Sequence, residues 1–501
     1  MARRLVLGLL LGVLLLAGAD GRLTRELRAD LDPDTLLALG PQLPFAKPDP
    51  TGASGAGGCS VAHHAGGARV GTGTRPPCAR LYRTGVTAFE TTLGIDADGT
   101  VFFNGLTEDA VGNGHSQVLR STYGGRSWQL VTPLIAGQDA HGTTEDPYLY
   151  LDPRTSRVFD DDLVEPCHML SFTDDGGETW TNDPPVGCGW NSDHQTVFAG
   201  PPPAGGAQPQ GYPDVVYLCS IAAVASVASF TANCSKSLDG GRTFVPTGEP
   251  AFVPDPSRAG DAGIPGACQG TTGHGFVGPD GTVYVPKGLC GQPFLAISHD
   301  EGATWTRVQV ASNGMNCCYA GLFYDHEAGV AADPDGNVYY AWVAADRLPY
   351  LAVSRDGGAT WGPPLEIGIP GLRESVLPAL ALGAPGKVAI AYLGSTNSPW
   401  DGTAAQGDYA SATWNEYVTE TTDALDADPL FTSVSVNDPA DPLVRGECGP
   451  IRCQTEGEFI NVQIGLDGTA WTSASDGCNF STCSGLGEGV AGHLVGGKSL
   501  R

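Results

Sequence analysis

The chain has 501 residues and a formal net charge of −28, because 55 Asp and Glu outnumber 27 Lys and Arg. A field this acidic excludes nucleic-acid binding through overall charge. The charged fraction is 16% and the hydrophobic fraction is 41%, which excludes a chain that is disordered throughout. The 71 Gly and 38 Pro do not suit a helical bundle and favour many short strands joined by turns.

The N-terminus predicts a secretory signal peptide over residues 1–19. Two arginines at positions 3 and 4 precede an apolar run at residues 5–16, and Ala17-Gly18-Ala19 forms a cleavage pattern. An uncleaved membrane anchor is the alternative, although the run is short for spanning a bilayer. No later apolar stretch approaches 18 residues, so we expect no transmembrane anchor after cleavage and a secreted, extracellular or cell-surface protein.

Fourteen cysteines fit an exported protein held together by disulfides. A zinc site is the alternative, but the sequence has no C-x-x-C pair and no Cys–His run with ligand spacing. Cys317 and Cys318 are adjacent, and their partners stay open. The spacing suggests six local pairs, which are Cys59–Cys78, Cys167–Cys188, Cys219–Cys234, Cys268–Cys290, Cys448–Cys453 and Cys478–Cys483.

A short phrase recurs along the chain and is the main signal for the fold. It reads Ser or Thr, any residue, Asp, a Gly-containing pair, any residue, Thr and an aromatic residue, as in Thr173–Trp180. A weaker copy ends at Trp128 and has Tyr in place of Asp. The closing aromatic residues lie 52 to 64 residues apart, the spacing of one propeller blade. The recurring Asp residues of the phrase are Asp175, Asp239, Asp300 and Asp356, and the closing aromatic residues are Trp128, Trp180, Phe244, Trp305 and Trp361.

The chemistry of this phrase indicates a structural turn. An Asp side chain accepts hydrogen bonds from the backbone of a turn, and Gly supplies positive φ without steric cost. The aromatic residue offers a large apolar surface that can wedge between neighbouring sheets. Calcium binding or catalysis by these Asp residues is the alternative, but each copy supplies only one or two carboxylates.

A second pattern precedes each copy, in which an Asp-Gly turn joins two apolar strands. Gly94–Phe103, Phe276–Val285, Val330–Tyr340 and Ile464–Trp471 show it clearly. With three looser versions the sequence predicts seven inner hairpins, and a degenerate turn near residues 421–423 follows the sixth. The units average about 60 residues, which fits four-stranded blades.

These phrases resemble the Asp-box (BNR) repeats of the sialidase superfamily. The resemblance implies a β-propeller, which has six blades in true sialidases. The repeat count here favours an all-β, seven-bladed propeller of four-stranded antiparallel blades over residues 81–501, with six blades as the alternative. Residues 20–80 lack the repeat and are expected to form a Gly/Pro/Ala-rich N-terminal arm.

Polar residues precede most of the predicted innermost strands, where they would ring the mouth of a central channel. Such a ring of carboxylates and imidazoles suits a binding site. The alternatives are that these side chains seal the channel, or that some of them hold a metal; because no helix or tight turn presents two ligands at a fixed spacing, we expect no metal site. The predicted substrate-binding residues are Glu90, His194, His274, Glu327, Arg373 and Glu458.

The resemblance also implies a chemistry for a working sialidase: three arginines that clamp a carboxylate, a Tyr nucleophile activated by Glu, and an Asp acid/base. Candidates for the catalytic roles are Asp146, Glu374 and Tyr409. The arginine motif of the family is missing near the first blade, where only Arg83 aligns. In the second half only Arg373 precedes an innermost strand, while Arg347 and the remaining arginines lie elsewhere.

The sequence therefore leaves three hypotheses open. The first is a sialidase-like propeller that binds an extracellular glycan or small ligand at the channel mouth. The second is an exo-acting glycoside hydrolase of sialidase type, and the third is a surface scaffold that binds proteins through loops such as residues 395–428. We expect no cofactor, and the sequence leaves the oligomeric state open.

Overall fold

Antiparallel β-strands make up nearly all of the regular structure, as the sequence predicts. Among the described residues the helices are two short 3-10 turns, η1 (Ala65–Gly67) and η2 (Asp408–Ser411), and no helix there is long and apolar enough to cross a membrane. The expected signal peptide, and the arm as far as residue 54, lie outside the described residues. The computed structural model describes residues 55–70, 74–108, 113–135, 138–139, 143–189, 192–224, 229–253, 272–289, 291–315, 317–319, 322–325, 328–401, 408–446, 448, 457–458, 460–479 and 482–501.

Five antiparallel sheets contain four strands each, and in each the strands are neighbours in chain order. They are β4 (Thr92–Ile95), β5 (Val101–Glu108), β6 (Gly114–Ser121) and β7 (Gln129–Leu130); β10 (Pro147–Leu151), β11 (Val158–Val164), β12 (Cys167–Thr173) and β13 (Thr181–Asn182); β14 (Asp193–Gly200), β15 (Val215–Val224), β16 (Ser229–Ser237) and β17 (Val245–Pro246); β18 (Phe276–Val277), β19 (Val283–Leu289), β20 (Gln292–Ser298) and β21 (Thr306–Gln309); and β24 (Gly329–Ala332), β25 (Val338–Val343), β26 (Pro349–Ser354) and β27 (Leu365–Glu366). Two separate hairpins are β8 (Leu134–Ile135) with β9 (Gln138–Asp139), and β22 (Cys317–Tyr319) with β23 (Leu322–Asp325).

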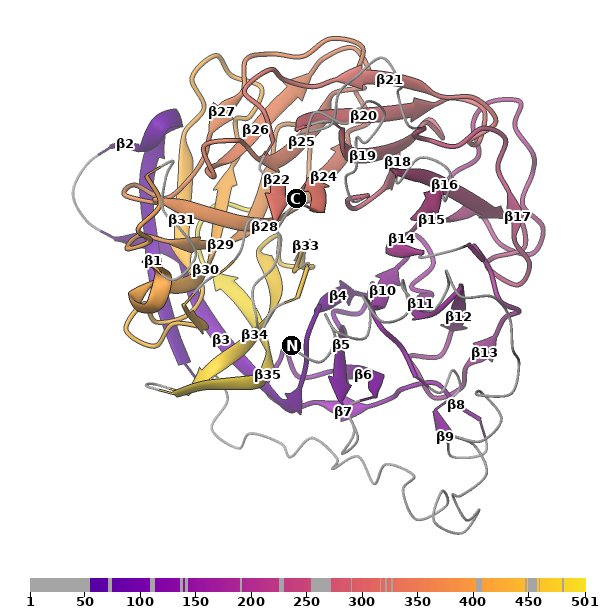
Figure 1. The fold of residues 1–501 in the computed structure, drawn as a ribbon, viewed down its shortest axis with the longest axis horizontal. Helices are drawn as coiled ribbons and strands as arrows, with labels where there is room; N and C mark the ends of the chain where they lie inside the picture. The colour runs from indigo at the N-terminus through magenta and orange to yellow at the C-terminus, as the bar shows by residue number, and fades with distance from the viewer. Residues whose placement is uncertain are drawn as a thin grey trace, which may run out of the picture. The chain divides into compact units, whose positions relative to one another are not determined.

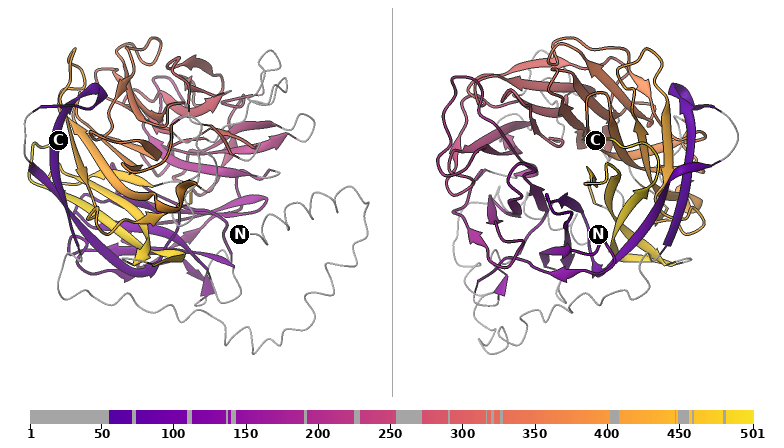
Figure 2. Two further views of the ribbon diagram at one scale, coloured as in Figure 1. Left: turned by 60° about the vertical axis from the view of Figure 1, so that its left-hand side comes forward. Right: turned by 180° about the vertical axis from the view of Figure 1, so that it is seen from behind.

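A larger sheet of eleven strands joins the two ends of the described chain. Its main path runs through β28 (Glu374–Leu382), β29 (Val388–Ser395), β30 (Thr413–Thr421), β31 (Phe431–Ser435), β1 (Gly55–His64), β3 (Arg75–Thr87), β35 (Thr482–Val495), β34 (Ala470–Asn479) and β33 (Asn461–Ile464). The short strands β2 (Ala68–Arg69) and β32 (Val444–Arg445) pair with β1 and β30. Figure 2 shows indigo β1 running beside the orange strands of the later chain. Within the described residues the sheet assembly includes strands from residue 55 onward, and residue 80, the expected end of the arm, lies within β3.

The sheets surround a common axis, which Figure 1 views end-on. The first strand of each four-stranded sheet and the two end strands of the eleven-stranded sheet lie nearest the axis. These strands touch one another in the order β4, β10, β14, β18, β24, β28 and β33. Strand β33 also contacts β4, so that the contacts close a ring. Sheets arranged radially about an axis in this way form a β-propeller.

The core lies between neighbouring sheets, which explains the apolar character of the middle strands. Strands β25 and β29 are buried at every residue, because each has another sheet against both of its faces. Val338–Val343 accordingly reads VYYAWV, without the alternation of a half-exposed strand. The core positions of these strands are thus set by burial on two sides.

The antiparallel order gives the ring two distinct ends. The innermost strands begin at one end, and the connections between second and third strands return there; we call this end the rim. The recurring turns follow the third strands and therefore lie at the opposite end, which we call the turn end. The described residues that were predicted to be catalytic or substrate-binding lie just before an innermost strand, at its first residues, or in a rim connection.

The recurring turns have the hydrogen bonds that the sequence pattern suggests. Asp300 Oδ1 accepts from the backbone N–H of Thr304 at 2.9 Å, and Asp300 Oδ2 accepts from the Thr304 hydroxyl at 2.7 Å. The same pair of bonds occurs at Asp175, Asp239 and Asp356. The indole N–H of Trp305 donates at 2.9 Å to Glu249 O, in the segment that follows β17. These contacts agree with a scaffold role for the turns.

Three of the expected disulfides are present, Cys59–Cys78, Cys167–Cys188 and Cys219–Cys234. Cys448 and Cys478 are also disulfide-bonded. Cys478 pairs in register with Cys483 across the β34–β35 hairpin. The expected partners Cys268, Cys290 and Cys453 lie outside the described residues.

Candidate functional site

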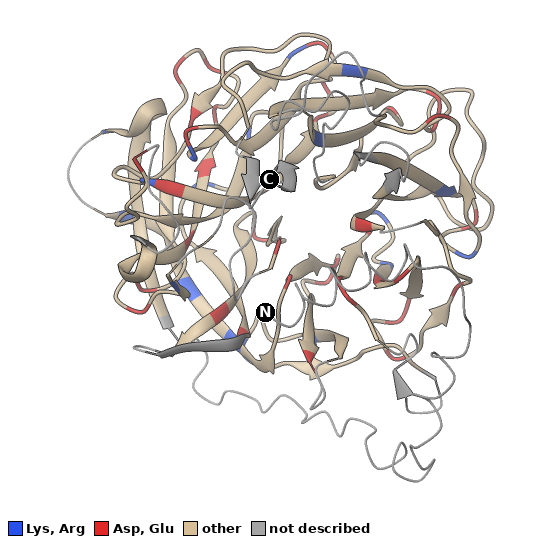
Figure 3. Ribbon diagram, viewed as in Figure 1, with Lys and Arg blue, Asp and Glu red and all other residues tan. Residues whose placement is uncertain are grey.

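The rim gathers two groups of polar side chains, and these make it the candidate functional site. Figure 3 shows acidic positions on several segments that face the axis of the ring. The first group comprises Asp193, His194 and Glu458, which we call the axial cluster. The second comprises Arg347, Glu374, Ser398, Trp400 and Tyr409, which we call the Arg347 cluster.

The axial cluster joins parts of the ring that are not neighbours. His194 lies at the start of β14 and Glu458 precedes β33, yet the imidazole Nε2 meets the Glu458 carboxylate directly. Asp193, His194 and Glu458 each present one ligand atom, and the three atoms lie within 4.8 Å of one another. The predicted binding residues His194 and Glu458 are thus in contact.

Glu90 lies beside this cluster in a tight position. Its side chain is buried and its backbone is left-handed, with φ of 56°. A Cβ on Gly457 would stand 2.2 Å from Glu90 Cγ, so that only glycine fits there. Gly457 also has φ of 75°, which glycine adopts without strain. The segment before β33 is therefore packed closely against Glu90.

His274 is held next to β24 and β10. Its backbone N–H donates to Ala328 O at 3.0 Å, and its Nδ1 is hydrogen-bonded to the Tyr148 hydroxyl at 2.8 Å. Thr196 Oγ1 lies 3.5 Å from the same hydroxyl. This arrangement orients the imidazole of His274 and links four of the innermost segments.

The Arg347 cluster brings together two of the three predicted catalytic residues. Arg347 Nη1 donates to Glu374 Oε1 at 2.5 Å and to Tyr409 Oη at 3.1 Å. The second oxygen of Glu374 accepts from the Ser398 hydroxyl, and Glu374 is fully buried. The guanidinium carbon lies 3.5 Å from the centre of the Trp400 ring, a cation–π contact.

Arg373 approaches the same tryptophan from solvent. Its side chain is exposed, and its Nη2 lies 3.4 Å from Trp400 O. Trp400 itself is half-buried. The Arg347 guanidinium therefore stacks on a partly exposed indole, and the Arg373 guanidinium lies near the backbone oxygen of the same residue, in a chain that is strongly acidic overall.

The third predicted catalytic residue has different surroundings. Asp146 is half-buried, and its backbone oxygen accepts from Gln195 Nε2 at 2.5 Å and from Leu163 N at 3.2 Å. These contacts tie it to β14 and β11, whereas Glu374 and Tyr409 share Arg347. Glu327 lies outside the described residues.

The sequence pattern did not identify Arg347 as a site residue, because Arg347 does not precede an innermost strand. It occupies the connection between β25 and β26, and its backbone O accepts from Ser375 N at 2.8 Å, which places it at the start of β28.

Arg83, by contrast, belongs to β3, where it donates to Asp476 at 2.5 Å and to Glu488 at 3.0 Å. Burial raises the pKa of Asp476, which the charge of Arg83 opposes. Arg83 is therefore bound to carboxylates of the neighbouring strands.

The structure also contains a buried Ser–His–Asp network that the sequence pattern did not indicate. His168 Nδ1 lies 3.1 Å from Asp161 Oδ2, and His168 Nε2 lies 2.8 Å from Ser192 Oγ. The order of groups is that of a nucleophilic triad. However, Ser192 is only 2% exposed, and its hydroxyl is within 3.1 Å of Ser220 Oγ. The network is closed to a substrate and instead fixes the residue before Asp193.

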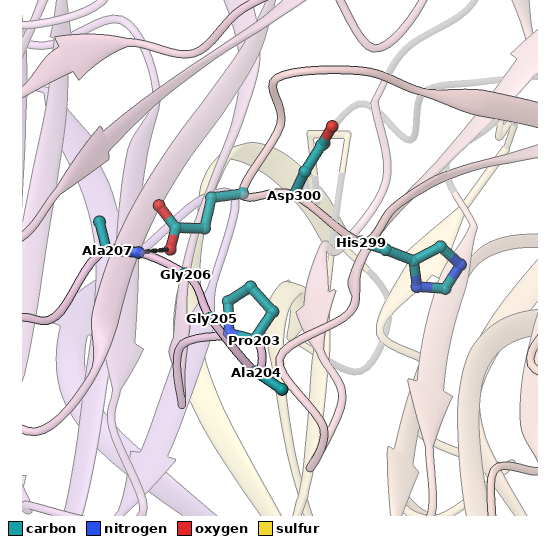
Figure 4. A pocket seen from close by; sticks show the side chains of 8 residues that line it. Pro203, Ala204, Gly205, Gly206, Ala207, His299 and Asp300 are labelled. Atoms are coloured by element: carbon teal, nitrogen blue, oxygen red, sulfur yellow. Dashed lines mark hydrogen bonds between the residues drawn. The ribbon is translucent and has the colours of Figure 1, made fainter.

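A small cavity of about 280 Å³ lies away from the rim (Figure 4). It is lined by the 203–207 loop and by residues 299–301 of a recurring turn. Glu301 closes one side, because it accepts from Ala207 N at 2.6 Å and from Lys236 Nζ at 2.5 Å. These are contacts between sheets at the turn end, and we assign the cavity to the scaffold.

No family model and no curated protein matches the sequence. Several solved structures are similar at low identity. A protein of unknown function from Dyadobacter fermentans DSM 18053 is 14% identical, with a TM-score of 0.40, over 81% of this chain and 94% of that one. The Hadza microbial sialidase Hz136 is 16% identical, with a TM-score of 0.41, over 66% and 68%. The Aleuria aurantia lectin is 12% identical, with a TM-score of 0.40, over 66% and 93%. At these values the similarities carry no weight for activity.

Proposed function

We propose that the chain is a secreted, seven-bladed propeller of sialidase-like Asp-box type, which binds a carbohydrate at its rim. The blade count is supported by the five four-stranded sheets and by the two ends of the eleven-stranded sheet. One end, β28 to β31, forms a sixth blade, and the other, β33 to β35 with β3, forms a seventh. The N-terminal strand β3 then completes the last blade. Disulfides support an exported location.

The observation that carries the carbohydrate proposal is Trp400 with its two arginines. Ligand sites combine an apolar or aromatic surface with a few polar groups in fixed positions. Trp400 supplies a half-buried aromatic surface, and Arg347 is fixed against it by buried Glu374. Exposed Arg373 adds a donor that a sugar hydroxyl or carboxylate can meet.

A glycan array followed by isothermal titration with the strongest hit tests this proposal. Trp400→Ala and Arg373→Ala should each weaken binding at least tenfold. Arg126→Ala is the matched control, because Arg126 is an exposed arginine in a recurring turn at the opposite end. A strong hit whose affinity is unchanged by both rim variants would overturn the proposal. Protein partners that bind equally well to both variants would favour the scaffold hypothesis.

Glycoside hydrolysis of sialidase type is the second candidate, and the shared contacts of Arg347 favour it. The Tyr409 hydroxyl and the Glu374 carboxylate bond to the same Nη1, which brings a potential nucleophile and a carboxylate close together. A fluorogenic sialoside assay tests the idea. Turnover that falls more than 100-fold in Tyr409→Phe and Glu374→Gln would support it, and an absence of turnover in the wild type would refute it.

A further inference from the structure

We propose that the axial cluster binds one divalent transition-metal ion of the Zn²⁺ class. Asp193, His194 and Glu458 offer three ligand atoms within 4.8 Å of one another. Ligand atoms bound to Zn²⁺ at about 2.0–2.2 Å stand roughly 3–4 Å apart. Small side-chain movements would therefore bring all three onto one ion. This proposal does not rest on carbohydrate binding.

The donor set selects the kind of metal. One imidazole nitrogen and two carboxylates suit Zn²⁺ and similar ions, because imidazole is a ligand of transition metals. Ca²⁺ and Mg²⁺ prefer sites made of oxygen ligands alone, and Ca²⁺ takes six to eight of them. We therefore expect Zn²⁺ to bind more tightly than Ca²⁺ at this site.

The surroundings hold the ligands in place before any ion binds. His194 is 4% exposed and the Glu458 side chain 11% exposed, so both are withdrawn from solvent. Asp193 Oδ1 accepts from the His194 backbone N–H at 2.7 Å, and the His194 carbonyl accepts from the Thr272 hydroxyl. Such outer contacts fix metal ligands in known sites.

The position of the cluster gives a bound ion a structural consequence. Its ligands come from the start of β14 and from the segment before β33, which are separated in the ring by three other innermost strands on one side and two on the other. One ion would cross-link these segments at the axis. Asp193 is only half-buried, so three protein ligands leave a coordination position that a water molecule or ligand can reach.

The alternative is a His–Glu ion pair that seals the axis without metal. The test uses the full chain, stripped with EDTA, and measures ZnCl₂ and CaCl₂ binding by isothermal titration, with bound zinc counted by mass spectrometry after dialysis. We expect one Zn²⁺ per chain and much weaker Ca²⁺ binding. His194→Gln and Glu458→Gln should each weaken Zn²⁺ binding more than about 100-fold, since even outer-shell partners are worth about 10- to 100-fold.

Two variants serve as controls. His299→Ala removes an exposed histidine beside Asp300 at the turn end, and Glu145→Gln removes an exposed carboxylate at the rim outside the cluster. Both should keep wild-type Zn²⁺ affinity. Cobalt absorption bands that disappear in His194→Gln but persist in His299→Ala would support the imidazole ligand. The absence of saturable Zn²⁺ binding, or wild-type affinity in both cluster variants, would overturn the proposal.

Discussion

The buried carboxyl group of Glu416 should contribute a pH dependence to the stability of this protein. Glu416 lies on β30, on the same face as Trp414 and Val418, and all three are fully buried. Among the described residues neither carboxyl oxygen has a hydrogen bond of normal geometry, and the nearby Thr472 hydroxyl only partly opposes the effect of burial on the pKa of Glu416. Burial in this apolar layer raises the pKa of Glu416 from about 4.5 to about 8.

The direction of the effect follows from the proton count. Between pH 4.5 and pH 8 the folded protein keeps a proton on Glu416 that the unfolded chain has released. The free energy of unfolding therefore falls as the pH rises through this range. From pH 4.5 to pH 7 the pKa shift corresponds to a loss of about 3 kcal/mol, at about 1.4 kcal/mol per pH unit.

The substitution Glu416→Gln removes the titration while keeping the size of the side chain. Urea denaturation followed by tryptophan fluorescence, at several pH values from 4.5 to 8, gives the difference in unfolding free energy between variant and wild type. We expect the variant to gain about 3 kcal/mol relative to the wild type between pH 4.5 and pH 7. A difference that stays constant across this range would contradict the raised pKa of Glu416.

Three further predictions concern the scaffold and the rim. Asp300→Ala removes the bonds to Thr304 and should cost about 1–3 kcal/mol, measured as a lower urea midpoint; an unchanged midpoint would contradict the scaffold role. Cys219→Ala with Cys234→Ala opens a disulfide of sequence separation 15 and should cost about 3 kcal/mol, which thermal unfolding would detect; equal stability would contradict it. Gly457→Ala should destabilise more than the control Gly336→Ala, because both have positive φ but only Gly457 faces Glu90; equal costs in urea would contradict this packing.

Much of the ring could be predicted because its signals are local. Asp-Gly turns between apolar runs mark the inner hairpins, and the hydrogen bonds of Asp300 join residues only four positions apart. The role of β1 and β3 could not be predicted in this way. Their partners β31 and β35 lie hundreds of residues away, and Gly55–His64 has no strand-like alternation.

The site was only partly predictable for the same reason. Position before an innermost strand identified Glu90, His194, Glu374 and Glu458 as rim residues. It did not identify Arg347, which reaches Glu374 from the connection after β25. It also gave no sign that Asp193, His194 and Glu458 meet, because two segments separated by more than 260 residues come together only across the axis.

A crystal structure of the chain with its strongest glycan ligand would show which end of the ring holds the carbohydrate. We propose that the rim binds the ligand and that the recurring turns only support the fold. We expect a sugar ring in contact with Trp400 and hydrogen-bonded to Arg373. Density for the sugar at the turn end, for example in the cavity between residues 203–207 and 299–301, would contradict it.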